Sequence, residues 1–490
     1  MSDLDNFFNP KSIAVVGVSS KGVGLQFGGA NFVNALQSCG FKGNIYPVNP
    51  KGGEVLGLHV YPSLMDIPGS VDYVICCISI SQVPQLINEC VAKGVKAVHL
   101  YTGGFSESGS EEGKRIEQEI ASFATQSGIH IIGPNCMGIY CPKTGLSFAS
   151  DFSSEPGSVA VICQSGGHSF HIIREGAERG VKFSKLISYG NACDVNESDL
   201  IEFLAADEDT RVIAAYIEGV KDGKRFARVL AKAAKVKPVI ILKGGITESG
   251  SRAAASHTGS MAGSEMVWDG LLHQANAIRV HNLEELVDMA LTFSYLPIIS
   301  GRKVGILGGG GGATVLAADD CIDAGLTVPR FSKALQDTLR NYLKKGNTGV
   351  GLSNPVDLSD QGWDIFYDCI KTMLDYNGID LLIFHMAFGI MPTMAQLDGF
   401  SSVILNDIAK AHNESDKPMV AATYSIINDE CWQAFTECRQ KCREIGVPCY
   451  YSLINAARAI SRFCDYHEHR NKIQEQGAGT QVGRSNKKPG

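Results

Sequence analysis

Short apolar runs alternate with amphipathic helical segments along the first third of the chain. The runs contain few polar positions, which is typical of strands that are buried on both faces of a sheet. In the segments between them, apolar residues recur three and four positions apart, as on one face of a helix. Repeated strand–helix–strand units predict a parallel sheet with helices on both faces. The predicted strands are 12–18, 43–49, 71–80, 95–102 and 129–135.

The same alternation begins again twice. A second series opens at 158–169 and a third at 303–325, and each of these segments runs from a strand through glycines into a helix. We predict an α/β protein with three open-sheet domains in series and a flexible tail, with ligands bound beyond the carboxyl ends of the strands. The further strands are 183–190, 211–219 and 237–245 in the second series, and 379–389, 417–425 and 447–453 in the third. The expected domains are 1–145, 150–298 and 300–465, followed by the tail 466–490.

The charge pattern narrows the class of protein. The 490 residues carry a formal net charge of −7, and the basic residues are scattered, except for a basic cluster at 484–488. Scattered basic residues in an acidic protein do not favour binding to nucleic acid or to an anionic membrane. The longest apolar runs have the length of strands and are too short to cross a membrane.

The fifteen cysteines lie mostly inside apolar runs, as in "YVICCISI" (73–80). The polar start "MSDLDNFFNPKS" lacks the apolar stretch of a secretory signal, so we expect a cytoplasmic protein whose cysteines are small buried hydrophobic residues. Because no C-x-x-C pair occurs, we expect no resident metal.

Each predicted domain begins with a strand, a glycine turn and a helix. The first turn of a helix carries N–H groups without intrahelical partners and a partial positive charge, so it suits phosphate. Glycine removes the side chain that would block the ligand. A glycine turn also serves close packing alone, and both interpretations stay open for each single turn.

The first glycine turn departs from the dinucleotide pattern G-x-G-x-x-G, since Val18 and Ser19 follow Gly17. After the second strand, where an NAD-binding protein carries an acid for the ribose, the chain has Asn49, Pro50 and Lys51. Lys51 suits a phosphorylated ribose or a pyrophosphate, as in coenzyme A. The alternative is an ordinary solvated loop lysine.

The segment "SRAAASHTGSMAG" (251–263) is rich in small residues and contains His257. One interpretation is a helix end with a hydrogen-bonded histidine. The other is a nucleophilic imidazole that needs room for a bulky group. From these residues alone, the first is the more ordinary.

Over about residues 5–465, the chain resembles the alpha subunit of ADP-forming acyl-CoA synthetases of the acetate–CoA ligase type, in the succinyl-CoA synthetase superfamily. The resemblance rests on a series of segments in the family's order. They are "SIAVVGVS", "GFKGNIYPVNPK", "GPNCMG", "CQSGG", "ISYGNACDVNESDLIEFLA", "YIEGVKDG", "KPVIILKGGITESGSRAAASHTGSMAG", "NLEELVDMA" and "SNPVDL".

This resemblance implies a Rossmann-like CoA-binding domain followed by two flavodoxin-like domains. It implies that His257 is transiently phosphorylated and that Glu218 supports its imidazole. Two helix N-termini from different domains would hold the phosphate. Their residues are Ser165, Gly166 and Gly167, and Gly310, Gly311 and Gly312. The residues implied for CoA are Gly17, Ser19, Ser20, Lys21, Lys51 and Asn135.

The resemblance also implies the reaction. Phosphate converts an acyl-CoA into an acyl phosphate and free CoA, His257 takes the phosphoryl group, and ADP receives it. No part of the chain resembles an ATP-grasp domain, which binds ADP or ATP with Mg²⁺ in this superfamily. A separate ATP-grasp beta subunit is therefore implied, in a heterotetramer that acts on a small carboxylic acid or its acyl-CoA.

The chain departs from many relatives near the second glycine turn, where it has Cys163, Gly167 and His168, and its third turn, "GGGGGA" (308–313), is unusually rich in glycine. His168 is either a substrate contact or a helix residue that faces solvent. Two other functions stay possible from the residues alone: a nicotinamide-dependent oxidoreductase and a non-catalytic CoA-binding relative. The missing acid after the second strand argues against the oxidoreductase.

Overall fold

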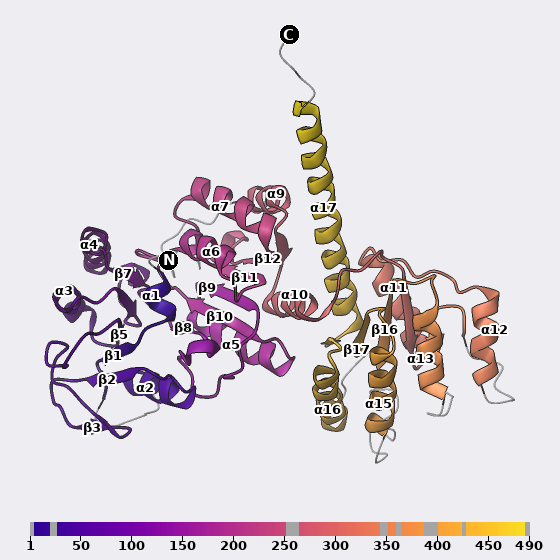
Figure 1. The fold of residues 1–490 in the computed structure, drawn as a ribbon, viewed down its shortest axis with the longest axis horizontal. Helices are drawn as coiled ribbons and strands as arrows, with labels where there is room; N and C mark the ends of the chain where they lie inside the picture. Colours follow the sequence, from indigo (N-terminus) through magenta and orange to yellow (C-terminus); the bar gives the residue numbers. More distant parts are fainter. Residues whose placement is uncertain are drawn as a thin grey trace, which may run out of the picture. The chain divides into compact units, whose positions relative to one another are not determined.

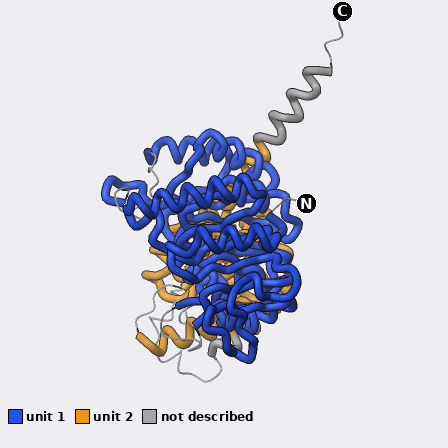
Figure 2. Tube along the Cα trace, turned by 90° about the vertical axis from the view of Figure 1, so that its left-hand side faces the viewer, with its two compact units in different colours: residues 1–177, 181–286 blue, residues 178–180, 287–490 orange. Residues whose placement is uncertain are grey.

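The computed structural model describes residues 4–19, 27–250, 264–343, 351–358, 365–386, 400–423 and 428–485. These residues form three larger β-sheets with helices packed against them, and one two-stranded sheet (Figure 1). The chain divides into two compact units, 1–177 with 181–286 and 178–180 with 287–490, which Figure 2 shows in different colours. The first unit contains two of the larger sheets and the second unit contains the third.

The first sheet has the strand order β2-β1-β5-β6-β7 and is parallel throughout. An isolated parallel bridge between Val48 and Tyr61 extends it beyond β2. With this bridge as a reduced third strand, the order becomes 3-2-1-4-5-6, the usual Rossmann order, and the predicted Rossmann-like domain is confirmed. The strands are β1 (Ser12–Val16), β2 (Asn44–Val48), β5 (Tyr73–Cys76), β6 (Ala97–Leu100) and β7 (His130–Ile132), with a small hairpin β3 (Glu54–Val55) and β4 (Leu58–His59). The helices are α1 (Asp5–Phe8), α2 (Gly29–Ser38), α3 (Val83–Lys93) and α4 (Glu111–Ser127).

The second and third sheets share one topology. Their parallel strands follow the orders β10-β9-β11-β12-β13 and β15-β14-β16-β17-β18. In chain order each is 2-1-3-4-5, which is the flavodoxin-like arrangement, so the two predicted flavodoxin-like domains are also confirmed. The strands of the second sheet are β8 (Gly138–Tyr140), β9 (Val159–Cys163), β10 (Phe183–Ser188), β11 (Val212–Ile217), β12 (Val239–Lys243) and β13 (Ile278–Val280). Those of the third are β14 (Val304–Gly308), β15 (Val356–Asp357), β16 (Leu381–Met386), β17 (Met419–Thr423) and β18 (Cys449–Tyr450).

Helices follow the strands of both flavodoxin-like sheets. With the second sheet they are α5 (Gly166–Glu178), α6 (Glu197–Ala206), α7 (Gly223–Val236) and α9 (Glu265–Ala275). α10 (Leu283–Tyr295) begins in the first unit and belongs to the second unit from Val287 on. With the third sheet the helices are α11 (Gly311–Asp323), α12 (Lys333–Tyr342), α13 (Phe366–Asp375), α15 (Phe400–Asn413), α16 (Asp429–Ile445) and α17 (Leu453–Ser485). α17 continues through most of the segment expected as a tail. Its first turns bury apolar residues such as Ile460 and Phe463, and the helix continues beyond them as far as Ser485.

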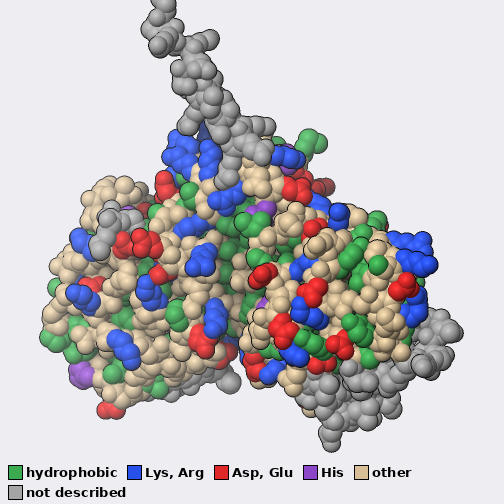
Figure 3. Space-filling model, turned by 45° about the vertical axis from the view of Figure 1, so that its right-hand side comes forward, with side chains coloured by type: hydrophobic (Ala, Val, Ile, Leu, Met, Phe, Trp, Pro, Cys, Tyr) green, Lys and Arg blue, Asp and Glu red, His purple; other side chains and the backbone are tan. Residues whose placement is uncertain are grey.

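Over the face shown in Figure 3, basic and acidic side chains are mostly interspersed. All fifteen cysteines are free thiols, and most are buried. Among the helices of the described residues, none combines the length and the apolar character that a membrane crossing requires.

The first and second sheets are joined within the first unit by an extensive set of hydrogen bonds. β8, which follows β7 of the first sheet along the chain, pairs antiparallel with β10 of the second sheet. Beyond β10, the main-chain N–H groups of Asn191 and Cys193 donate to the carbonyls of Pro134 and Gly133, at 3.0 and 2.9 Å. The Asn191 amide also donates to Glu107 and Glu117, at 2.6 and 2.9 Å. These bonds fix the carboxyl end of the first sheet against the loop that precedes α6.

Gly190 should be indispensable to this junction. Its φ is +54°, and a Cβ there would lie 2.1 Å from the carbonyl oxygen of Pro134. We expect Gly190→Ala to lower the free energy of unfolding by about 3 kcal/mol, as measured by urea denaturation. Gly94→Ala is the matched control, because Gly94 also has a positive φ, +79°, but a Cβ there would meet no atom within 4 Å. The control should cost about 1 kcal/mol. Equal effects for the two variants would show that the junction does not require close contact.

Candidate functional site

The first glycine turn, after β1, packs closely against the main chain that follows β5. Gly17 has a φ of +96°, and a Cβ there would lie 2.5 Å from the carbonyl oxygen of Cys77, just after β5. Gly29, at the start of α2, also lies close to the turn, since its Cβ would be 2.9 Å from the carbonyl oxygen of Gly17. Both glycines are therefore required by packing. They bring the α2 N-terminus to the point where the strand order reverses, which is where ligands of such sheets bind.

Asn49, which follows β2, has a structural role at the position where NAD-binding proteins carry an acid. Its side-chain N–H donates to the carbonyl of Val18 at 2.8 Å, and its side-chain oxygen accepts from the main-chain N–H of Lys51 at 2.9 Å. The amide therefore ties the loop after β1 to the loop after β2. Ser19 and Lys51 lie exposed on these two joined loops.

The other residues predicted for CoA divide into two groups. Asn135 lies at the same carboxyl edge, half-buried beyond β7, with a φ of +58° and its N–H donated to the carbonyl of Thr102 at 3.0 Å. Ser20 and Lys21 lie outside the described residues. The structure thus locates Gly17, Ser19, Lys51 and Asn135 beyond the carboxyl ends of one sheet.

The second glycine turn, Ser165–Gly167, connects β9 to α5. The Ser165 hydroxyl accepts the main-chain N–H of His168 at 3.3 Å and so caps the first turn of the helix. A Cβ at Gly166 would lie 3.0 Å from Cγ of Met137, whereas a Cβ at Gly167 would meet no atom within 4 Å. The exposed turn at Gly167 leaves the helix N-terminus accessible, and such an N-terminus attracts anions.

Glu218 lies beside this turn because β11 neighbours β9. It directly follows β11, and only 7% of its surface is exposed. The buried side chain of Gln164, next to Ser165, accepts the N–H groups of Glu218 and Gly219 at 2.7 and 3.2 Å. The Tyr216 hydroxyl donates to Oε1 of Glu218 at 3.2 Å. The structure thus brings Glu218 and the second glycine turn together at one sheet edge.

Lys243 is a further member of this cluster that was not predicted from the sequence. It ends β12, is 4% exposed, and donates from Nζ to the carbonyl of Glu218 at 2.7 Å and to that of Gly244. Nζ also lies 5.5 Å from the ring centre of Trp268 on α9. Burial lowers the pKa of Lys243 to about 8, against the opposite effect of the Glu218 charge. A lysine that ends an otherwise apolar strand, "KPVIILK", was the signal available in the sequence.

The lowered pKa of Lys243 predicts a pH dependence of stability. Between the folded pKa of about 8 and the unfolded value near 10.4, the unfolded chain binds more protons, so stability rises with pH across this window. Relative to Lys243→Met, the wild type should gain about 2 kcal/mol of unfolding free energy from about pH 7.5 to about pH 10. Urea denaturation across this range measures the difference, with Lys42→Met as the control for the loss of one exposed lysine. A constant difference between wild type and Lys243→Met would contradict the burial of an ionisable amine.

His168 belongs to the same cluster and does not simply face solvent. Its ring is half-buried and packs edge-on against Tyr216, with the ring centres 4.7 Å apart. Burial lowers its pKa, the Glu218 charge opposes this, and His171 adds to the lowering. His171, one turn later, is paired with Glu175 at 2.7 Å and has a side chain that is 52% exposed.

The third glycine turn, in the second unit, has an acidic neighbour of its own. Gly310 precedes α11 with a φ of +97°, and its N–H donates to Asp357 at the end of β15 at 2.9 Å. Gly311 and Gly312 are exposed in the first turn of α11. Asp357 therefore lies against the helix N-terminus that was predicted to bind phosphate.

His257 lies outside the described residues, so the structure does not describe its position. The chain enters this undescribed segment, 251–263, after β12 and leaves it before α9. On these two flanking elements, Lys243 and Trp268 are in contact. The elements on either side of the segment therefore meet close to Glu218.

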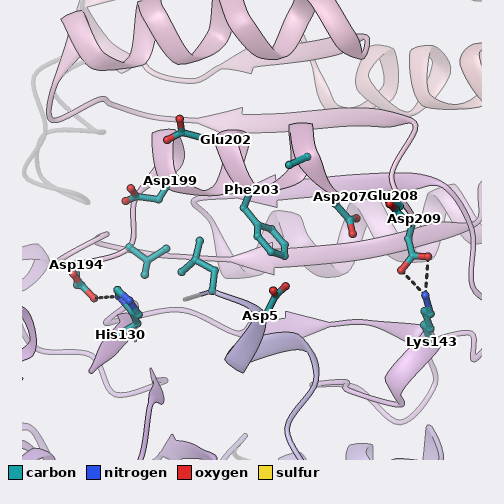
Figure 4. Close-up of a pocket in the computed structure, with 13 residues that line it drawn as sticks. Asp5, His130, Lys143, Asp194, Asp199, Glu202, Phe203, Asp207, Glu208 and Asp209 are labelled. Atoms are coloured by element: carbon teal, nitrogen blue, oxygen red, sulfur yellow. Dashed lines mark hydrogen bonds and ion pairs between the residues drawn. The ribbon is translucent and has the colours of Figure 1, made fainter. Parts of the chain in front are cut away.

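A cavity of about 1020 Å³ lies elsewhere in the first unit, along α6 (Figure 4). Many acidic side chains line it, but several are already engaged: Asp194 faces His130 at 3.5 Å, and Asp209 pairs with Lys143 at 2.8 Å. The residues predicted for CoA, for phosphate and for catalysis are absent from its described lining. The described residues that were predicted for the site lie at the strand ends and not at this cavity.

Comparison with protein-family models assigns both domains of the first unit. Residues 11–142 match the CoA binding domain, and residues 156–293 match the succinyl-CoA ligase-like flavodoxin domain. The alpha subunit of acetate–CoA ligase [ADP-forming] II from Pyrococcus furiosus is 40% identical over 396 residues, which make up 80% of this chain and 83% of that protein. The alpha subunit of the type I enzyme from the same organism is 34% identical over 480 residues, 96% of this chain and 99% of that protein.

A solved structure is similar over almost the whole chain. It is that of dinucleotide-forming acetyl-coenzyme A synthetase 1 from Ca. Korarchaeum cryptofilum in complex with phosphate and ADP. The TM-score is 0.82 at 29% sequence identity, and the match covers 97% of this chain and 99% of that one. The similarity therefore includes all three sheets.

Proposed function

Because the chain belongs to the family of ADP-forming acetate–CoA ligase alpha subunits, we propose that it carries the acyl-transfer and phosphohistidine steps of an ADP-forming acyl-CoA synthetase. The overall reaction converts acyl-CoA, ADP and phosphate reversibly into acid, ATP and CoA. One observation carries the assignment of the site: Glu218 and the glycine turn Ser165–Gly167 share one sheet edge and are joined through Gln164. A carboxylate beside an open helix N-terminus suits a histidine that receives a phosphoryl group.

Two chemical steps take place on this chain. A phosphate oxygen attacks the thioester carbonyl carbon, the C–S bond breaks, and CoA leaves with the proton that phosphate gives up. A ring nitrogen of His257 then attacks phosphorus, and the P–O bond to the acyl group breaks to release the carboxylate. Glu218 accepts the other ring N–H, which fixes the tautomer and stabilises the positive charge that develops on the imidazole. In a third step ADP takes the phosphoryl group from His257.

The residues proposed to bind phosphate lie at two helix N-termini, one in each unit. Ser165, Gly166 and Gly167 supply one, and their exposed, capped turn supports the assignment. Gly310, Gly311 and Gly312 supply the other. Because Asp357 already accepts the Gly310 N–H, that turn binds phosphate through the later N–H groups of its first turn.

CoA binds at the carboxyl edge of the first sheet in this proposal. Gly17, Ser19 and Lys51 lie on the two loops that Asn49 joins, and Asn135 lies at the same edge. Ser20 and Lys21 complete the set. Asn49 stands where NAD-binding proteins carry an acid for the ribose, and its amide bonds to the main chain. Nothing in the described part of the site favours an oxidoreductase.

Lys51 should contribute to CoA affinity through a charge-assisted contact. We expect Lys51→Glu to weaken CoA binding by about 1–3 kcal/mol in isothermal titration calorimetry. Lys42→Glu makes the same charge change at an exposed position of the same domain and should leave the affinity unchanged. NAD should give no heat of binding with the wild type. Binding of NAD and not of CoA would refute the proposed site.

A partner subunit completes the enzyme in this proposal. The relatives are named as alpha subunits, which supports a second chain, and we infer an ATP-grasp beta subunit that binds ADP or ATP with Mg²⁺ in a heterotetramer. The proposed domains remain 1–145, 150–298 and 300–465. Fifteen free thiols support a reducing compartment such as the cytoplasm.

His257 should carry the phosphoryl group. With acyl-CoA and radiolabelled phosphate, the purified chain should gain a label that is stable in alkali and lost in acid, as expected of a phosphohistidine. We expect His257→Asn to abolish the label, because an amide is not a nucleophile that can carry the group. Glu218→Gln should slow labelling about 100-fold, by analogy with the loss of one electrostatic contact to the transition state.

The controls separate this assignment from its competitors. His171→Asn alters an exposed histidine on α5 and should label at the wild-type rate. All variants should bind CoA with the wild-type affinity, because CoA binds another domain. A label that persists in His257→Asn would move the phosphorylated residue elsewhere, and absence of any label in the wild type would favour a non-catalytic relative.

A further inference from the structure

The first turn of α5 presents few side chains to the proposed phosphate site. Gly166 and Gly167 have none, and the Ser169 hydroxyl donates back to the carbonyl of Ser165 at 2.9 Å. His168 is therefore the one residue of positions 166–169 whose side chain extends toward the ends of the neighbouring strands. It does so over Tyr216, at a ring-centre distance of 4.7 Å.

The acyl group must lie within reach of this turn. In an acyl phosphate, the acyl carbon is bonded directly to a phosphate oxygen. If the helix N-terminus holds the phosphate, the acyl group is only a few bond lengths from the first-turn residues. The nearby side chains therefore decide how much space it has.

Two side-chain contacts are made at this helix end. Met137, 8% exposed, lies against Gly166, where a Cβ would be 3.0 Å from its Cγ. His168 packs edge-on against Tyr216. Tyr216 is itself fixed, because its hydroxyl donates to Glu218 at 3.2 Å and a Cβ at Gly244 would lie 2.7 Å from its oxygen. Tyr216 therefore gives the His168 ring a fixed neighbour.

We propose that His168 determines acyl specificity, and that its imidazole restricts the site to short acyl groups. The inference rests on the proposed function and extends it to the substrate class. Removing the ring leaves a space beside Tyr216 that a branched or aromatic acyl group fills. A single methylene in such a pocket changes kcat/KM about 10-fold or more, so the loss of a whole ring should be easily measured.

The test uses the full chain and needs no partner. CoA release from acetyl-CoA, isobutyryl-CoA and phenylacetyl-CoA is followed in the presence of phosphate, in single turnovers. We expect the wild type to prefer acetyl-CoA. His168→Ala should raise the rate with phenylacetyl-CoA relative to acetyl-CoA about 10-fold or more. His168→Trp should lower the rate with isobutyryl-CoA relative to acetyl-CoA by a similar factor.

Controls distinguish a residue that sets acyl selectivity from one with a merely structural role. His171→Ala removes the other α5 histidine and should leave all ratios unchanged. The phosphate concentration that gives half the maximal rate should change less than about twofold in His168→Ala, because the helix N–H groups remain.

The outcomes separate this inference from the proposed function. Unchanged acyl selectivity in active His168→Ala and His168→Trp variants would overturn the role of His168 alone. If the wild type released CoA from no acyl-CoA at all, both the proposed function and this inference would fall.

Discussion

The buried amide of Gln164 is the contact on which the candidate site depends. It belongs to the turn between β9 and α5, yet its oxygen accepts the two N–H groups that follow β11. Beyond the end of a strand, main-chain groups lose their ladder partners and must find others when they are buried. Gln164 supplies that partner, and it thereby holds the N-terminus of α5 next to Glu218. A site built on two loops gains the rigidity of the sheet beneath it.

The same solution recurs at the other strand ends. Asn49 joins the loops after β1 and β2, Asn191 joins the first sheet to the loop before α6, and Asp357 accepts the N–H of the turn after β14. In each case a short polar side chain satisfies main-chain or buried groups at the edge where ligands bind. These side chains therefore have a structural role. Asn49 is the clearest example, because it stands where an acid would bind a ribose.

The strand–helix order, the glycine turns and three open α/β domains could be predicted from the sequence because they follow from local periodicity. The Rossmann-like and flavodoxin-like classes were implied by the family resemblance. Glu218 was found only through a family resemblance, since nothing local distinguishes it. Lys243 and the role of Gln164 were missed because their meaning arises from neighbouring strands that are far apart in sequence. Local polarity also led us to predict a flexible tail over 466–490, and the structure describes this segment as part of α17 (Leu453–Ser485) as far as Ser485.

The three glycine turns look alike in sequence but differ in what their glycines do. Gly17 is required by contact with Cys77, so its lack of a side chain reflects packing. Gly310 adopts a positive φ and donates its N–H to Asp357, so its lack of a side chain has a backbone reason. At Gly167 neither a close neighbour nor a positive φ explains the glycine. Gly312, in the first turn of α11, shares both properties, so each of two helix N-termini has open space that packing does not explain. At Gly167 this space lies beside Glu218, which Gln164 joins to the turn.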